Sequence, residues 1–170
     1  MSMRSVMLAH FKLRLLAAIG LLAMAVPLAS LAWSEEVMIW SEKTNGTSTS
    51  LGYRSITTVA GPLFMVTCFN GMSIVVLDVH KEIDGAKPGQ PIIIEISSAK
   101  ARSPIEGEVA RNDATGKTFG EATDIDIKPL LELLRHPGVV TIKMGETSAT
   151  LSDRGRAEAV AKFSKNCEVE

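Results

Sequence analysis

Cysteine is scarce in this sequence: the 170 residues include two, Cys68 and Cys167. No CxxC pair occurs, so the usual cysteine signatures of structural zinc sites and redox-active dithiols are missing. Two cysteines allow a single intramolecular pairing. An intramolecular disulfide must therefore join Cys68 to Cys167 and close a loop of about 100 residues.

Runs of basic residues are also missing. The formal net charge of the chain is −1, and residues 33–170 carry 15 Lys and Arg against 19 Asp and Glu, a net charge of −4. Nucleic acids and anionic membranes bind basic patches. This charge balance argues against both as partners.

Catalytic motifs are missing as well. The sequence has no GxSxG nucleophile elbow and no HExxH zinc motif. The stretch ATGKT at 114–118 resembles the end of a phosphate-binding loop, but Arg111 stands where that loop requires glycine. We interpret it as a turn between strands, and we predict no catalytic residue and no cofactor.

The first 32 residues have the pattern of a secretory signal peptide. Arg4, Lys12 and Arg14 precede an uncharged apolar stretch, and small residues lie at Ser30 and Ala32 before the predicted cleavage site. An uncleaved anchor is the alternative, because the apolar stretch is just long enough to approach a bilayer span. Cleavage would leave residues 33–170 as a single domain, periplasmic or secreted, with no stable membrane span.

An oxidising compartment favours a disulfide between Cys68 and Cys167. A buried free thiol and a nucleophile are the alternatives for Cys68. A catalytic cysteine needs an adjacent base and exposure to substrate. The position of Cys68 on its strand argues against an adjacent base and against exposure to a substrate.

Two apolar, β-rich stretches, 63–69 and 72–80, flank Asn70-Gly71, which is typical of a β-hairpin with a two-residue turn. In that register Phe69 faces Met72. Because side chains alternate along a strand, Cys68 shares an apolar face with Phe64 and Val75. We therefore expect Cys68 to point into the core.

The remaining pattern predicts an α+β fold that is mainly β. We expect an antiparallel β-sandwich or meander, with a short helix and a C-terminal helix packed on the sheet. Asp126 is the expected cap of the short helix, and Asp153 or Ser152 that of the last one. The apolar side of the last helix would be Ala157, Val160, Ala161 and Phe163 to Ser164. Further strands are expected at 37–41, 51–58, 91–101, 105–112, 118–123, 139–144 and 147–152, with a hairpin turn at Gly145-Glu146 and a polar loop over 43–52.

The stretch DVHKEID at 78–84 is a weak candidate for a metal site. Alternation along a strand could place Asp78, His80 and Glu82 on one side. A solvated strand end that runs into a turn is the simpler interpretation, because protein zinc sites usually show better defined ligand pairs. Asp78 and His80 are retained as candidates.

The order of the motifs carries a resemblance. A WS…LGY segment (Trp40 to Tyr53) precedes the cysteine strand, and VTIKMG, ATLSDRG and AVAKFSKNC close the chain. This order resembles small uncharacterised periplasmic proteins of proteobacteria and, more distantly, the invasion-associated locus B-like proteins. The resemblance implies an envelope or secreted protein, sometimes linked to host contact, and transfers no functional residue.

These observations predict a non-enzymatic secreted or periplasmic binding protein, stabilised by one disulfide, whose partner is an unknown protein or envelope component. The first alternative is a secreted virulence effector that acts in a host cell. The second is a metal-dependent hydrolase that uses His80 with Asp78.

Overall fold

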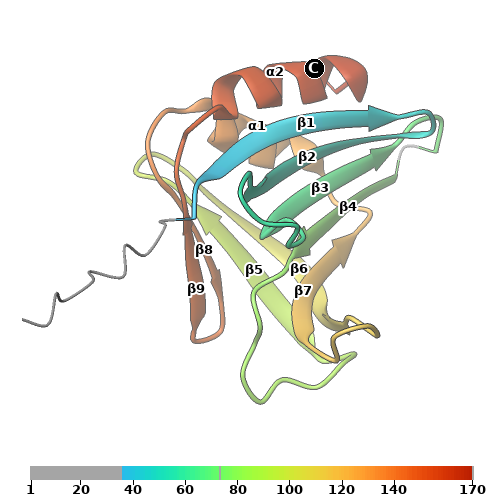
Figure 1. Ribbon diagram of the computed structural model, residues 1–170, viewed down its shortest axis with the longest axis vertical. Helices are drawn as coiled ribbons and strands as arrows, with labels where there is room; N and C mark the ends of the chain where they lie inside the picture. The colour runs from blue at the N-terminus through green and yellow to red at the C-terminus, as the bar shows by residue number, and fades with distance from the viewer. Residues whose placement is uncertain (1–35, 73, 170) are drawn as a thin grey trace, which may run out of the picture. The chain divides into compact units, whose positions relative to one another are not determined.

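Nine antiparallel strands form one sheet in the computed structural model, which describes residues 36–72 and 74–169 (Figure 1). The predicted signal peptide, residues 1–32, lies outside the described residues. Two helices accompany the sheet, α1 (Ile127–Arg135) and α2 (Arg156–Asn166). The strands are β1 (Met38–Asn45), β2 (Ser48–Ser55), β3 (Phe64–Phe69), β4 (Ile74–Val79), β5 (Pro91–Ser97), β6 (Arg102–Arg111), β7 (Thr118–Thr123), β8 (Val140–Met144) and β9 (Thr147–Leu151).

The strand order is β1-β2-β3-β4-β7-β6-β5-β8-β9, and the sheet is open. The predicted fold class, α+β and mainly β, is therefore confirmed. The sheet is not a simple meander. After β4 the chain crosses to β5, and the β5–β7 unit runs back so that β7 pairs with β4. This crossover brings the two halves of the sheet around one core.

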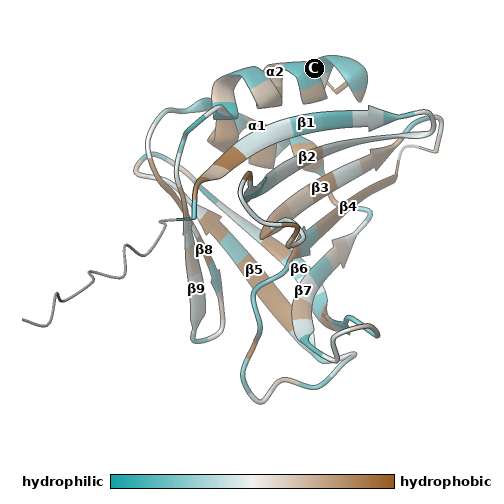
Figure 2. Ribbon diagram, in the orientation of Figure 1, coloured by the Kyte–Doolittle hydropathy of each residue, from teal (hydrophilic) through white to brown (hydrophobic). Residues whose placement is uncertain are grey.

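Gly120 shows how strongly the sheet bends. This residue lies on β7, three strands from β8 in the sheet order. Even so, a Cβ atom at Gly120 would lie 2.5 Å from the Met144 sulfur on β8 and 3.3 Å from Ile94 Cδ1. The concave face is thus folded onto itself, and hydrophobic residues follow β3, β4 and β5 around it (Figure 2).

Trp40 joins the two ends of the sheet. Its indole Nε1 donates to the Ser152 carbonyl at 2.6 Å, and its backbone N–H donates to the Arg154 carbonyl at 3.1 Å. The Tyr53 hydroxyl adds a contact to the Ser152 hydroxyl at 3.2 Å. These hydrogen bonds therefore hold β1 against the residues that directly follow β9.

The β3–β4 hairpin differs from the prediction in its turn. Phe69 pairs with Ile74, so four residues connect the strands where two were expected. A type I′ turn needs positive φ at both central residues, and here Gly71 has it (81°) whereas Asn70 does not. The register moves by two residues, which keeps every side chain on its predicted face. Cys68 therefore points into the core as expected and is 6% exposed.

The predicted polar loop over 43–52 is wrong, because most of it belongs to the β1–β2 hairpin. The turn is Gly46-Thr47. The threonine and serine side chains suit a strand here because they bond across it: Thr44 contacts Thr49 at 3.2 Å, and Ser50 contacts Thr67 at 3.2 Å. The two-residue turn at Gly145-Glu146 is confirmed by the pairing of Met144 with Thr147.

Both helices are anchored at their starts, one as predicted. The Asp126 carboxylate accepts from the Lys128 N–H at 3.1 Å and caps α1. The predicted caps of α2 are wrong, because its N-cap is Gly155. Its φ of 78° favours glycine, and a Cβ atom there would make a tight contact of 3.1 Å with the Trp40 carbonyl oxygen. Asp153 instead accepts from the Gly138 N–H at 2.9 Å.

Helix α2 lies along β1 and packs against α1 (Figure 1). Its buried side is rotated from the predicted one. Val160, Phe163 and Ser164 are buried as expected, whereas Ala157 and Ala161 are exposed and Arg156 is buried. The arginine is buried because it faces the end of α1.

Candidate binding groove

A groove of about 890 Å³ lies beside the start of β3 and the end of β4, where Leu63 and His80 line it. Four segments that are distant in sequence form its walls: residues 60–63, 80–84, 112–119 and 146–148. Glu36, Met38 and Ser55 complete the lining. The groove therefore lies between the start of β1 and the tip of the β8–β9 hairpin.

His80 presents a neutral aromatic surface at the groove. Its ring lies 4.7 Å from the Phe119 ring, centroid to centroid, with the planes tilted by 36°. Burial lowers the pKa of His80, so the imidazole is uncharged at neutral pH. Together with Leu63 and Met38, these rings form an apolar part of the lining.

Asp78 lies on the same face of β4 as His80 but does not line the groove. It stands directly opposite Glu121 on β7, and Glu121 stands opposite Glu108 on β6. Burial and, secondarily, the Glu121 charge raise the pKa of Asp78 from 3.8 to about 6. Asp78 is thus part of a row of carboxylates on the outer face of the sheet.

The predicted metal candidates are not gathered into a site. Glu82 forms an ion pair with Lys117 at 3.2 Å, while Asp78 faces Glu121. Over residues 36–72 and 74–169, no three His, Cys, Asp or Glu side chains lie close enough together to hold a metal ion. His80 and Asp78 share a strand face without sharing a pocket.

Hydroxyl groups in the groove are used to hold its loops. The Thr118 hydroxyl donates to the Ile83 carbonyl at 3.2 Å, and the Thr147 hydroxyl donates to the Glu82 carbonyl at 3.4 Å. The Ser55 hydroxyl accepts from the N–H groups of Thr57 and Thr58. Each hydroxyl therefore fixes a loop, and none of these three donates to a side-chain base, as a nucleophile would.

The loop between Ser55 and Ala60, two residues that line the groove, exposes apolar side chains and is here called the apolar rim. Ile56 is 60% exposed and Val59 is fully exposed, although both ends of the loop are fixed by backbone hydrogen bonds. Exposed apolar residues beside a hollow are typical of an interaction surface. Sequence analysis missed this feature, because Ile56 falls within the predicted strand 51–58.

Acidic side chains outnumber basic ones around the groove. Glu36, Glu82, Asp84 and Glu146 line it, against Lys81 and Lys117. Lys117 is already paired with Glu82. The remaining wall carries a negative potential, which favours a cationic occupant.

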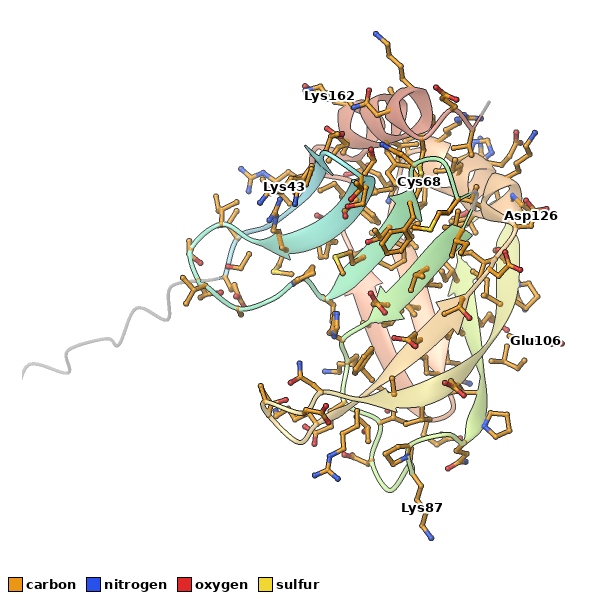
Figure 3. All side chains as sticks on the ribbon, turned by 90° about the vertical axis from the view of Figure 1, so that its right-hand side faces the viewer. Lys43, Cys68, Lys87, Glu106, Asp126 and Lys162 are labelled. Atoms are coloured by element: carbon orange, nitrogen blue, oxygen red, sulfur yellow. A yellow bond between two sulfur atoms is a disulfide. The ribbon has the colours of Figure 1, made fainter. Side chains whose placement is uncertain are left out.

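The disulfide lies at the opposite end of the fold. Cys68 and Cys167 are joined, with 6.1 Å between their Cα atoms, and Figure 3 shows the bond beside the label of Cys68. A second hollow of about 510 Å³ adjoins it, formed by the β3–β4 turn and the facing ends of α1 and α2. The bridge ties the end of α2 to β3, as the sequence predicts.

Comparison with known proteins adds no assignment: no family model, curated protein or solved structure matches the chain. Among the described residues, no helix is long and apolar enough to cross a membrane.

Replacing Asp78 with asparagine should stabilise the protein above about pH 6. The folded state raises the pKa of Asp78 from 3.8 to about 6, so ionisation of Asp78 costs more in the folded than in the unfolded chain. That cost appears as pH rises from 3.8 through 6 and is absent below both values. We expect a gain of about 1 kcal/mol at about pH 7.5, discounted for solvent screening, that disappears near pH 4.

Chemical denaturation at several pH values measures this effect. Asp113→Asn is the matched control, because Asp113 is an exposed residue of the turn that follows β6. The control should follow the wild-type pH dependence. A gain from Asp78→Asn that persists unchanged at pH 4 would show that the carboxylate is not the cause.

Proposed function

We propose that the protein is a non-enzymatic binding module of an oxidising, extracytoplasmic compartment, and that the groove receives its partner. The observation that carries the proposal is the exposed apolar rim at Ile56 and Val59 beside a hollow of about 890 Å³. Hollows of this size suit a ligand or a peptide segment. The partner would be a protein or another component of the cell envelope.

The groove chemistry favours binding over catalysis. Enzymes hold an activated nucleophile, acid or base in place with a third group. Here Glu82 is neutralised by Lys117, and the hydroxyls of Thr118 and Thr147 hold backbone groups. His80 stacks on Phe119, which supports an aromatic contact surface.

The disulfide supports the choice of compartment. Thiols stay reduced in most cytosols, whereas a bridge between Cys68 and Cys167 persists in the periplasm or outside the cell. The predicted signal peptide is the second argument for export.

Site-specific photo-crosslinking in the producing cell tests the proposal. A benzophenone amino acid replaces Val59 at the rim, and in a matched control it replaces Ile93, which is 49% exposed on β5. We expect a discrete crosslinked adduct from position 59 and none from position 93. Both positions expose an apolar side chain, so a difference between them reports the surface and not hydrophobicity.

Equal crosslinking at the two positions, or none at position 59 in a folded sample, would contradict the proposed function. A mass measurement of the adduct identifies the partner.

A further inference from the structure

We infer that the groove receives its partner as an extended strand added to β9, and that this strand carries basic side chains. The inference rests on the proposed function and gives the binding mode and the chemistry of the partner. Three observations support it: an unpaired strand edge, the uncharged sequence of that edge, and the charge of the groove wall.

Strand β9 is the last strand of the sheet, and one of its edges is unpaired. The two-residue turn makes Met144 and Thr147 a hydrogen-bonded pair, so the N–H and C=O groups of Ser148 and Thr150 point away from β8. Within the described part of the chain, no hydrogen bond from outside the β8–β9 pair reaches these groups. Ser148 also lines the groove, which places this edge on its wall.

The edge of β9 lacks the features that usually protect an open strand. Natural edges carry charges, prolines or covering elements. The β9 sequence, TSATL, contains no charged residue and no proline, and Ser148 and Thr150 are exposed. The opposite edge strand, β1, contains Glu42 and Lys43 and is covered by α2. Of the two terminal strands of the described sheet, β9 is therefore the one with the uncovered and uncharged edge.

The charge of the wall selects the occupant. Glu36, Asp84 and Glu146 are exposed along the groove, and Lys81 is the remaining base that lines it apart from the paired Lys117. A second copy of this chain would bring two such acidic walls together and would be repelled. A strand in which lysine or arginine alternates with apolar residues would place cations on the wall and apolar groups at Phe119 and Leu63.

A synthetic peptide provides the probe. It has about eight residues, alternates lysine with valine and carries fluorescein; its control alternates glutamate with valine. We expect the lysine peptide to bind the purified protein and the glutamate peptide to bind at least about tenfold more weakly. Amide hydrogen exchange, followed residue by residue by NMR, should slow at Ser148 and Thr150 when the lysine peptide binds, because strand addition engages both N–H groups.

Substitutions on β9 separate backbone pairing from side-chain contact. Thr150→Pro removes the outward N–H, which pairs with no other strand of the described sheet. This variant should bind the lysine peptide about tenfold more weakly than wild type. Thr150→Val keeps the N–H and should bind within about twofold of wild type. Glu146→Lys should weaken binding of the lysine peptide and strengthen binding of the glutamate peptide.

The outcomes distinguish this inference from the proposed function. Crosslinking at position 59 that survives Thr150→Pro, in a protein that melts like wild type, would overturn strand addition and leave the groove as the binding surface. Binding without slower exchange at Ser148 and Thr150 would also overturn it, whether or not Thr150→Pro folds. A crosslink to a second copy of this chain would overturn the inference that the partner strand is basic.

Discussion

Replacing Arg156 with methionine should lower the free energy of unfolding by about 3–5 kcal/mol. Arg156 is 2% exposed, and its guanidinium donates to three backbone carbonyls at and beyond the end of α1: Leu134 at 3.0 Å, His136 at 2.5 Å and Gly138 at 2.6 Å. Methionine fills a similar volume but donates no hydrogen bond. The three carbonyls would lose this donor, and the carbonyl of the buried Leu134 has little access to water in its place.

The effect is large because one guanidinium donates to three carbonyls at once. The last carbonyls of a helix lack intrahelical donors, and a cation near them also interacts favourably with the helix dipole. Burial lowers the pKa of Arg156, while Asp153 opposes this shift. The guanidinium also lies over the Trp40 ring, 5.9 Å from its centroid, and the aromatic face stabilises the buried charge.

Equilibrium denaturation of the Arg156→Met variant measures the effect. Arg154→Met is the matched control, because Arg154 is two residues away, is exposed, and contributes its backbone carbonyl to Trp40. The control should change the free energy of unfolding by less than about 0.5 kcal/mol. A loss below about 1 kcal/mol at Arg156 would mean that the three hydrogen bonds contribute little beyond packing.

Breaking the disulfide should lower the free energy of unfolding by about 2–5 kcal/mol. The bridge joins residues 99 positions apart, so its loss frees a long loop in the unfolded chain. Cys167→Ser is the cleaner variant, since Cys167 is partly exposed whereas Cys68→Ser would also bury a hydroxyl in the core. The variant Cys68→Ser should therefore be less stable than Cys167→Ser.

Reduction of the wild-type protein is the control for the disulfide variants. Wild type treated with a phosphine reductant should unfold at the same denaturant concentration as Cys167→Ser, and reductant should leave the variant unchanged. A thiol count of two on the untreated protein would contradict the bridge directly. Equal stability of oxidised and reduced wild type would contradict its role in stability.

The predictions that came true rest on local patterns. Alternation of apolar residues around Cys68 placed its side chain in the core. The turn is two residues longer than expected, but a shift of the strand register by two residues leaves each side chain on the same face of the sheet. Asp126 was recognisable as a helix cap because capping depends on one side chain and on backbone N–H groups close to it in sequence. Gly145 marked its hairpin for a similar local reason.

The features that sequence analysis missed depend on segments far apart in the chain. The groove combines loops around residues 60, 82, 115 and 147, and their approach follows from a strand order that puts β7 beside β4. The burial of Arg156 was not predicted, because the three carbonyls that accept from it belong to the region of α1. The polar part of the β1–β2 hairpin was interpreted as a loop, because its threonine and serine side chains bond to neighbouring strands that the sequence does not show beside them.

The two ends of α2 have a consequence for the order of folding. Arg156 holds the start of the helix to α1, Cys167 holds its end to β3, and the helix packs along β1, the first described strand. The earliest and latest parts of the described chain are thus mutual partners. A chain that emerges gradually from a ribosome or a translocation channel cannot complete this fold until α2 and Cys167 have emerged, because β1 and β3 pack against or bond to them.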